Sequence, residues 1–238
     1  MKCRLCLEHR KLIKAHIIPE SFFLPLRSGK RVPEIHSDIE GKYPKKTPIG
    51  IYDTSILCLK CDKAIGVWDN YAQQLLLKDF GEDLAVYYGS KKVAYKIDAF
   101  DYDKLKLFFI SVLWRASISD QYFYKRVNIG AYESVLREMI LSNNPGAPED
   151  FPVVIAKFGD PNVTGMLDPH KDNFDGINFY RFYITGFVIY VKVDKGKMPE
   201  FLEPFYIRRG QPIWIILRDL HRSKDGKIMK NIMTKGKR

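Results

Sequence analysis

The sequence predicts an α+β fold in which a small N-terminal module precedes a helical middle and a mostly antiparallel β-sheet C-terminal region. Two C-x2-C pairs bracket the first part. Apolar residues then recur at three- and four-residue spacing, the period of a helix. From Pro152 onward Ile, Val, Phe and Tyr become frequent, with Gly and Pro between the apolar runs. We therefore expect a module at 1–78, an α+β domain at 79–223 and a basic tail at 224–238.

The first elements are a loop-rich segment and a helix. Residues 26–55 are rich in Gly, Pro, Lys and Ser without a sustained period, which favours loops. Cys61–Lys78 is predicted to be helical because Ile65, Trp68 and Ala72 share one face.

The middle of the chain predicts a hairpin and two further helices. Leu84–Tyr88 and Val93–Ile97 are predicted strands joined by a turn at Gly89-Ser90-Lys91. A helix is expected up to Ser117 with Asp103 as its N-terminal cap, and another over Ile129–Leu141.

The C-terminal part predicts strands followed by a frayed end. The expected strands are Val153–Phe158, Ile177–Val193, Pro204–Ile207 and Pro212–Arg218. Ile177–Val193 is long for one strand, and Gly186 marks a bulge or bend within it. Lys224–Arg238 is basic and poor in aromatic residues, so we expect a frayed tail there.

The net charge of +11 is concentrated at the two ends of the chain. Residues 1–78 carry 14 Lys and Arg against 8 Asp and Glu, residues 208–238 carry 10 against 2, and the middle carries 15 against 18. Such clustering favours a polyanionic partner, and nucleic acid in particular. The alternative is a solvated basic surface.

The chain contains no apolar run near the roughly 18 residues of a membrane span, and Met1-Lys2-Cys3 is not followed by an apolar signal region. We therefore expect a cytoplasmic protein with no membrane partner. In a reducing compartment, paired cysteines are more often metal ligands than disulfides.

All four cysteines occur in the two C-x2-C pairs, which are Cys3–Cys6 and Cys58–Cys61. Two residues between thiolates place both sulfurs on one tight turn, and two such pairs complete the tetrahedral ligand set of a structural zinc ion. The alternatives are coincidence or a redox pair. The sequence predicts one structural zinc ion, which would stabilise a segment that lacks an obvious core of its own.

The order of a cysteine knuckle, His16-Ile17-Ile18-Pro19, a loop, Ile56-Leu57-Cys58-x-x-Cys61 and a helix resembles the HNH, or His-Me finger, endonucleases that carry a four-cysteine zinc site. The resemblance covers residues 1–78. It implies a treble-clef-like ββα zinc module and a nuclease that uses one divalent metal ion, Mg²⁺ or Mn²⁺. Treble-clef modules without nuclease activity share much of this order.

The resemblance also implies roles for three residues. His16 matches the family's general base, and a neutral imidazole suits that task. Asp62 matches a metal ligand, and Asp53 lies near the residue that positions the catalytic loop. Ala15 departs from the family, since the residue before the base is usually Asp or His and binds the metal. His16 also has a structural interpretation as a hydrogen-bonded residue, and Asp69 or His36 could replace the missing ligand.

Several basic residues near these positions are candidates for phosphate contacts. They are Arg10, Lys11, Lys14, Lys60 and Lys63. A solvated basic face is the competing interpretation for each of them. DNA is the more probable partner than RNA, and the C-terminal domain is expected to recognise the substrate, a partner protein or a signal.

The sequence thus favours an HNH-like DNA endonuclease of a bacterial defence or mobile-element system. The alternative is a catalytically inactive zinc-stabilised nucleic-acid-binding or adaptor protein, and a third option is a protein–protein interaction module. Elsewhere, the segment around His170 is expected to be a polar loop, and Arg115 is expected to extend its charge from the core to the surface.

Overall fold

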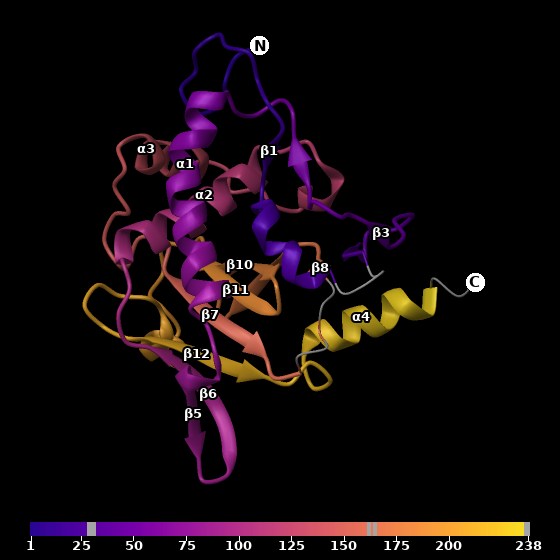
Figure 1. Ribbon diagram of the computed structural model, residues 1–238, viewed down its shortest axis with the longest axis vertical. Coiled ribbons are helices and arrows are strands. Elements are labelled where there is room, and N and C mark those ends of the chain that lie inside the picture. Colours follow the sequence, from indigo (N-terminus) through magenta and orange to yellow (C-terminus); the bar gives the residue numbers. More distant parts are fainter. Residues whose placement is uncertain (28–31, 161–162, 164–165, 236–238) are drawn as a thin grey trace.

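The computed structural model describes residues 1–27, 32–160, 163 and 166–235. It has an α+β architecture in which helices pack against a large mixed sheet (Figure 1). One cluster of buried apolar side chains extends from Cys3 in the N-terminal part to Ile215 in the sheet. The predicted fold class is confirmed at this level, and the cluster joins the residues on both sides of position 78.

Helices provide most of the first half of the fold. The α-helices of the described residues are α1 (Leu59–Gln73), α2 (Tyr102–Ser117), α3 (Tyr132–Leu141) and α4 (Lys224–Lys235). A π-helical turn, Gln74–Lys78, prolongs α1, so the predicted helix over Cys61–Lys78 is confirmed. Nearly every residue of α2 is buried, which makes this helix the centre of the core.

The seven-stranded sheet has the order β5-β6-β12-β7-β11-β10-β9. Its strands are β5 (Ala85–Tyr88), β6 (Lys91–Ile97), β7 (Val153–Phe158), β9 (His170–Phe174), β10 (Ile177–Ile184), β11 (Phe187–Lys192) and β12 (Ile213–Arg218). Neighbouring strands are antiparallel except β12 and β7, which run parallel. The sheet is therefore mostly antiparallel, as predicted.

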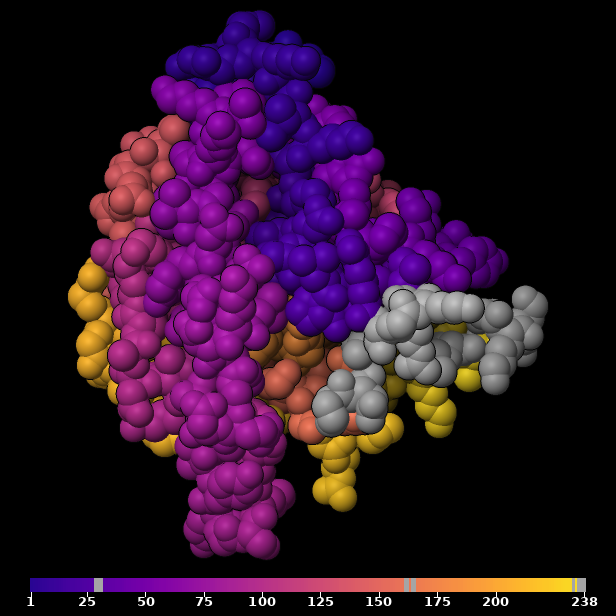
Figure 2. Space-filling model, in the orientation of Figure 1, coloured from indigo at the N-terminus to yellow at the C-terminus, as the bar shows by residue number. Residues whose placement is uncertain are grey.

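Two smaller sheets lie in the N-terminal part. Strands β1 (Ala15–His16) and β4 (Tyr52–Asp53) form an antiparallel pair. Strands β3 (Lys45–Lys46), β2 (Glu34–His36) and β8 (Met166–Leu167) form a three-stranded sheet in which β2 and β8 are parallel. In Figure 2 the N-terminal residues (indigo) lie directly beside the segment that contains α1. These short strands position the candidate site.

Three predictions about the C-terminal part were wrong. The run Ile177–Val193 is two strands and not one, because Thr185 and Gly186 adopt positive φ angles of 50° and 81° and form a hairpin turn between β10 and β11, so the bend expected at Gly186 is a complete reversal of the chain. The segment Pro204–Ile207 contributes only an isolated bridge from Tyr206 to Val154. His170 lies at the start of strand β9 and not in a loop.

The expected frayed tail was also wrong over residues 224–235, which form helix α4, while residues 236–238 lie outside the described part. Asp225, in the first turn of α4, is 1% exposed and forms ion pairs with Arg181 (3.1 Å) and Arg218 (2.9 Å). Tyr183 donates a hydrogen bond to the same carboxylate. Buried charges of strands β10 and β12 thus hold the start of α4, which no local pattern in the tail could indicate.

The cap of α2 differs by two residues from the prediction. Asp101, not Asp103, precedes the helix and accepts a hydrogen bond from the backbone N–H of Lys104 at 3.1 Å. Within the described residues, none of the helices has the length and apolarity that crossing a membrane requires.

Candidate functional site

The four cysteines meet at the N-terminal end of α1. Their Sγ atoms all lie within 4.8 Å of one another. Cys3, Cys58 and Cys61 are buried, and Cys6 is partly exposed. Four sulfurs at this spacing form a group that can hold a metal ion such as zinc.

Backbone hydrogen bonds explain why the two distant pairs come together. The backbone N–H of Leu7 donates to the carbonyl of Cys3 at 2.9 Å and closes the first knuckle, with Leu7 at a positive φ of 60°. Arg4 N–H donates to the carbonyl of Ile56 at 2.8 Å, which fixes the knuckle against the second pair. The N–H of Cys58 points at the sulfur of Cys3 at 3.4 Å. The backbone therefore forms the metal-binding geometry.

The thiols differ in how readily they ionise. Burial opposes ionisation of Cys3, but hydrogen bonds from the backbone of Cys6, Cys58 and Leu5 outweigh it and lower the pKa of this thiol to about 7. Burial raises the pKa of Cys6 and of Cys61. A cluster in which one thiolate forms easily and its neighbours resist needs a cation to ionise them all.

His16 lies on a short antiparallel ladder that leads into α1. Ala15 pairs with Asp53, and His16 pairs with Tyr52. Helix α1 follows β4 after a short connection and carries Asp62 in its first turn. His16 thus lies on a two-stranded ladder whose second strand precedes α1 in the chain.

The imidazole of His16 is half-buried, and its Nε2 atom has no hydrogen-bond partner among the described residues. Its ring lies edge-on to that of Tyr52, with 5.8 Å between the centroids. Burial lowers the pKa of His16, and the charges of Glu20 and Asp62 offset this only in part. The ring is therefore neutral at neutral pH, and its unpartnered Nε2 is enclosed by the surrounding residues.

Two carboxylates, Asp62 and Asp69, occupy one face of α1 because seven residues make two helical turns. Burial raises the pKa of Asp62, and the charge of Asp69 adds to this, whereas Arg115 and His16 oppose it. Asp69 is bound by Arg115 at both oxygens, at 2.9 and 2.8 Å. Asp62 is thus the carboxylate that remains available beside His16.

Sequence reasoning did not predict the contacts that Arg115 makes with the site. Arg115 is 1% exposed, so the predicted extension to the surface was wrong. Its Nη1 atom donates both to Asp69 and to the backbone carbonyl of His16, each at 2.9 Å. The guanidinium connects α2 to α1 and β1, and its partners lie 46 and 99 residues away in the chain. A periodic apolar helix gives no local signal for such contacts.

Asp53 is buried and fully hydrogen-bonded. Its Oδ1 accepts from the N–H and hydroxyl of Ser55, and its Oδ2 accepts from the hydroxyl of Ser119 and the N–H of Asp120. Burial alone would raise the pKa of Asp53, but these hydrogen bonds outweigh it and lower the pKa. The carboxylate therefore connects the turn after β4 to the end of α2 and fixes the position of these two segments relative to each other.

The other candidates for a second ligand are placed differently. Ala15 is fully buried and offers no ligand atom. His36 lies on β2, in the three-stranded sheet. Glu20, four residues after His16, acts on the His16 ring more strongly than Asp62 does. Glu20 was not identified from the sequence.

The five basic candidates are all exposed. Lys14 approaches the site most clearly, since its Nζ lies 5.3 Å from the centroid of the Tyr52 ring that also contacts His16. Arg10 pairs with Glu8 at 2.5 Å. A cavity of about 470 Å³ adjoins Tyr52 and is bordered by the exposed residues Lys45 and Lys46, which sequence reasoning did not single out.

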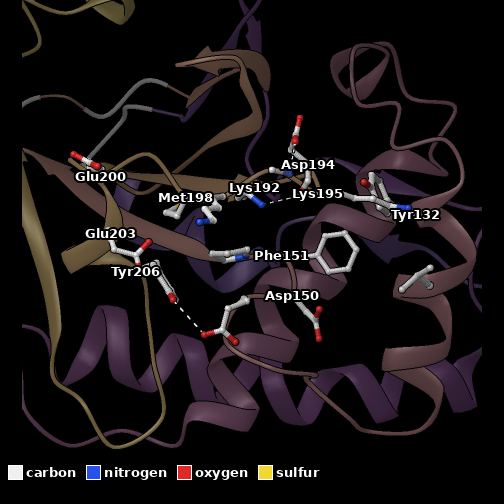
Figure 3. Close-up of a pocket in the computed structure, with 15 residues that line it drawn as sticks. Tyr132, Asp150, Phe151, Lys192, Asp194, Lys195, Met198, Glu200, Glu203 and Tyr206 are labelled. Carbon is white, nitrogen blue, oxygen red and sulfur yellow. Dashed lines mark hydrogen bonds between the residues drawn. The ribbon is translucent and has the colours of Figure 1, made fainter.

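A cavity of about 810 Å³ lies elsewhere (Figure 3). Its walls come from α3, the segment before β7 and the segment 192–206. The buried Lys192 donates to the backbone carbonyl of Asp194 at 2.6 Å within it. None of the predicted site residues lines this cavity.

Comparison with protein-family models, curated proteins and solved structures found no match in any of the three. The interpretation of the site therefore depends on the residues of this chain.

Proposed function

We propose that this chain is an HNH-like, metal-dependent endonuclease that hydrolyses phosphodiester bonds in DNA. The observation that carries the proposal is the arrangement of His16. It has an unpartnered Nε2, lies on the β1–β4 ladder, and interacts with Asp62 in the first turn of the following helix.

Each neighbouring residue has a defined part in this mechanism. His16, neutral because burial lowers its pKa, takes a proton from the attacking water. Arg115 holds the His16 backbone and keeps the ring in place. Lys14, beside Tyr52, offers a cation to the phosphate. A Mg²⁺ or Mn²⁺ ion held by Asp62 would polarise the phosphate and stabilise the leaving oxygen.

The four-cysteine group would hold a structural zinc ion in a treble-clef-like module. It supplies only sulfur ligands, which suit zinc and do not suit Mg²⁺ or Mn²⁺. The exposed basic residues around it (Arg10, Lys11, Lys60 and Lys63) would contact the DNA backbone. The remainder of the chain would recognise the substrate or a protein partner, in a bacterial defence or mobile-element system.

A specific observation favours a second candidate function, a nucleic-acid-binding or adaptor protein without activity. Ala15 is buried and provides no metal ligand, and Arg115 occupies both oxygens of Asp69. The proposed metal would then depend on Asp62 and on Glu20, whose charge also reaches His16.

Cleavage of supercoiled plasmid DNA in Mg²⁺ or Mn²⁺ tests the proposal. We expect nicked product from the wild type, and a loss of about 100-fold or more in rate for His16→Ala, the usual contribution of a general base. If the Glu20 carboxylate replaces the missing ligand, Glu20→Gln is expected to raise the Mg²⁺ concentration that half-maximal cleavage requires. His9→Ala is a matched control, because His9 is an exposed histidine of the same module.

DNA affinity separates the candidate functions. DNA binding without cleavage by any variant would favour the adaptor, and cleavage unchanged in His16→Ala would remove His16 from the mechanism. A wild type that fails to bind DNA or RNA even at low salt would favour a protein-interaction module.

A further inference from the structure

A second group of potential metal ligands lies away from both His16 and the cysteines. Strands β2 and β8 run parallel, with His36 opposite Leu167. Asp38 follows β2, and Asp168 follows β8, where its backbone N–H donates to the carbonyl of His36 at 2.9 Å. His170 begins β9 two residues later. One ligand atom from each of Asp38, Asp168 and His170 lies within 4.8 Å of the others.

The side chain of Arg126 lies at the centre of this group. Its Nη1 atom contacts Asp38, and it lies 3.3 Å from Oδ2 of Asp168 and 3.1 Å from Nε2 of His170. A single cationic nitrogen therefore occupies the point on which the three ligand atoms converge. The two carboxylates together carry two negative charges, and Arg126 supplies one positive charge.

The orientation of His170 is the one seen in metal-binding histidines. Its Nδ1 lies 2.7 Å from the backbone carbonyl of Asp168, which can only accept a hydrogen bond. Nδ1 therefore carries a proton, and Nε2 is the ring atom that faces the cluster. Nε2 lies 3.4 Å from Oδ1 of Asp38 and 3.1 Å from Nη1 of Arg126, so it points at the position that a cation occupies.

The carboxylate of Asp168 is an independent sign of a cation. The residue is completely buried, and its Oδ1 atom has no hydrogen-bond partner in the described part of the chain. Ser37 donates only to the other oxygen, at 3.0 Å. A buried carboxylate oxygen without a partner is costly unless a positive charge compensates it.

The cluster is accessible from solvent. The side chain of Asp38 is 32% exposed and that of Arg126 is 35% exposed. A cavity of about 220 Å³, lined by the segment Ser37–Pro44 and by Asn231 and Ile232 of α4, reaches Asp38. An ion thus has a route to the ligands, and Arg126 has room to move away.

We propose that Asp38, Asp168 and His170 bind a divalent transition-metal ion, with Arg126 as an internal cation that competes for the same position. Two carboxylates and one imidazole suit Mn²⁺ or Zn²⁺. A divalent ion neutralises both carboxylates, whereas Arg126 neutralises one. This site is independent of the proposed nuclease function.

Titration of the full chain with Mn²⁺, followed by electron paramagnetic resonance, tests the proposal in an Asp62→Asn background. Mn²⁺ is a hard ion that a four-thiolate site binds poorly, and the background substitution removes the ligand of the proposed catalytic ion. We expect Mn²⁺ binding that Asp168→Asn and His170→Gln weaken by at least the roughly 10-fold that loss of even an outer partner costs. His221→Gln, an exposed histidine, is the control.

Arg126→Gln provides a test in the opposite direction. Removing the competing cation should tighten Mn²⁺ binding, whereas Lys125→Gln, which removes an exposed neighbouring charge, should not. The proposal is overturned if the background chain binds no Mn²⁺, if Asp168→Asn and His170→Gln leave the affinity unchanged, or if Arg126→Gln binds no more tightly than its parent. The Arg126 result decides the matter even where the other two variants fail to fold.

Discussion

The two ends of the chain are held by buried polar groups of opposite kinds, the N-terminal end in the apolar cluster that contains α2 and the C-terminal end against a second apolar cluster on the sheet. At the N-terminus, four thiols lie within 4.8 Å of one another without an opposite charge among them. At the C-terminus, the buried carboxylate of Asp225 is ion-paired with Arg181 and Arg218 from two strands. The first cluster could hold a metal ion from outside the chain, and the second contains both signs of charge.

This difference indicates how each end should respond to its surroundings. A site made of thiolates gains its free energy from metal binding, so its stability depends on the supply of metal. An ion-pair network depends on keeping every partner, because removing one leaves a buried charge uncompensated. The N-terminal strands are two to three residues long, whereas β10 has eight. The N-terminal end therefore has fewer strand hydrogen bonds to stabilise it.

Removal of the metal is the largest expected effect. Chelation, or Cys58→Ser, should remove a contribution on the order of 10 kcal/mol and unfold the N-terminal module. Hydrogen exchange measures this, since the N–H of Ile13 and of Ile17 donate to carbonyls across the module. These amides should lose protection while those of β10 and β11 keep theirs. Elemental analysis that finds no zinc or other transition metal, or equal protection after chelation, would contradict the comparison.

Breaking the C-terminal network should have a smaller effect. Asp225→Asn leaves the buried guanidinium of Arg181 with Asp172 alone, at 2.6 Å. We expect a loss of about 3 kcal/mol in the free energy of unfolding, at the lower end of the range for broken buried pairs. Urea denaturation measures it, with the exposed Glu40→Gln as control. Chelation should leave this difference unchanged, and a difference that disappears with the metal would show that the two ends are coupled.

Lys106 differs from both ends of the chain, because its buried amine contacts a backbone carbonyl and has no carboxylate as a hydrogen-bond partner among the described residues. It donates to the backbone carbonyl of Asp150 at 2.6 Å, and burial lowers its pKa to about 7. The unfolded chain therefore binds more protons than the folded chain between pH 7 and about 10. Stability from this residue rises with pH there, by at most about 1.4 kcal/mol per pH unit.

The free energy of unfolding of the wild type, minus that of Lys106→Met, should therefore rise between pH 7 and pH 9. The exposed Lys227→Met should give a difference that stays constant. A constant difference for Lys106→Met as well would mean that Lys106 keeps an ordinary pKa in the folded state.

Local patterns were enough to predict much of the fold. The periodicity of Ile65, Trp68 and Ala72 predicted α1, and the alternation around Gly89 predicted the β5–β6 hairpin. Gly186 indicated a bend in the long run, but a full hairpin turn was not predicted because threonine, the other residue of the turn, rarely adopts a positive φ. Helix α4 was missed because its anchor, Asp225, finds its partners only in the folded sheet.

The candidate site divides in the same way. The spacing of the cysteines predicted their cluster, whereas the ββα arrangement around His16 was implied only by the family resemblance and stays a prediction. The roles of Arg115, Glu20 and Arg126 were not identified. Arg115 and Arg126 contact residues that are far away in the sequence, and Glu20 acts on His16 through its charge. Whether Asp53, Asp62 and the basic residues act in catalysis or binding stays a prediction.

The position of β12 affects the order in which the chain can fold. This strand, residues 213–218, lies between β6 and β7 and pairs with both. During synthesis, the hairpin β5–β6 and the strands β7, β9, β10 and β11 all leave the ribosome before β12 does. Until then each presents an unpaired strand edge to other chains, a recognised hazard for aggregation. The last tenth of the polypeptide therefore unites the two halves of the sheet.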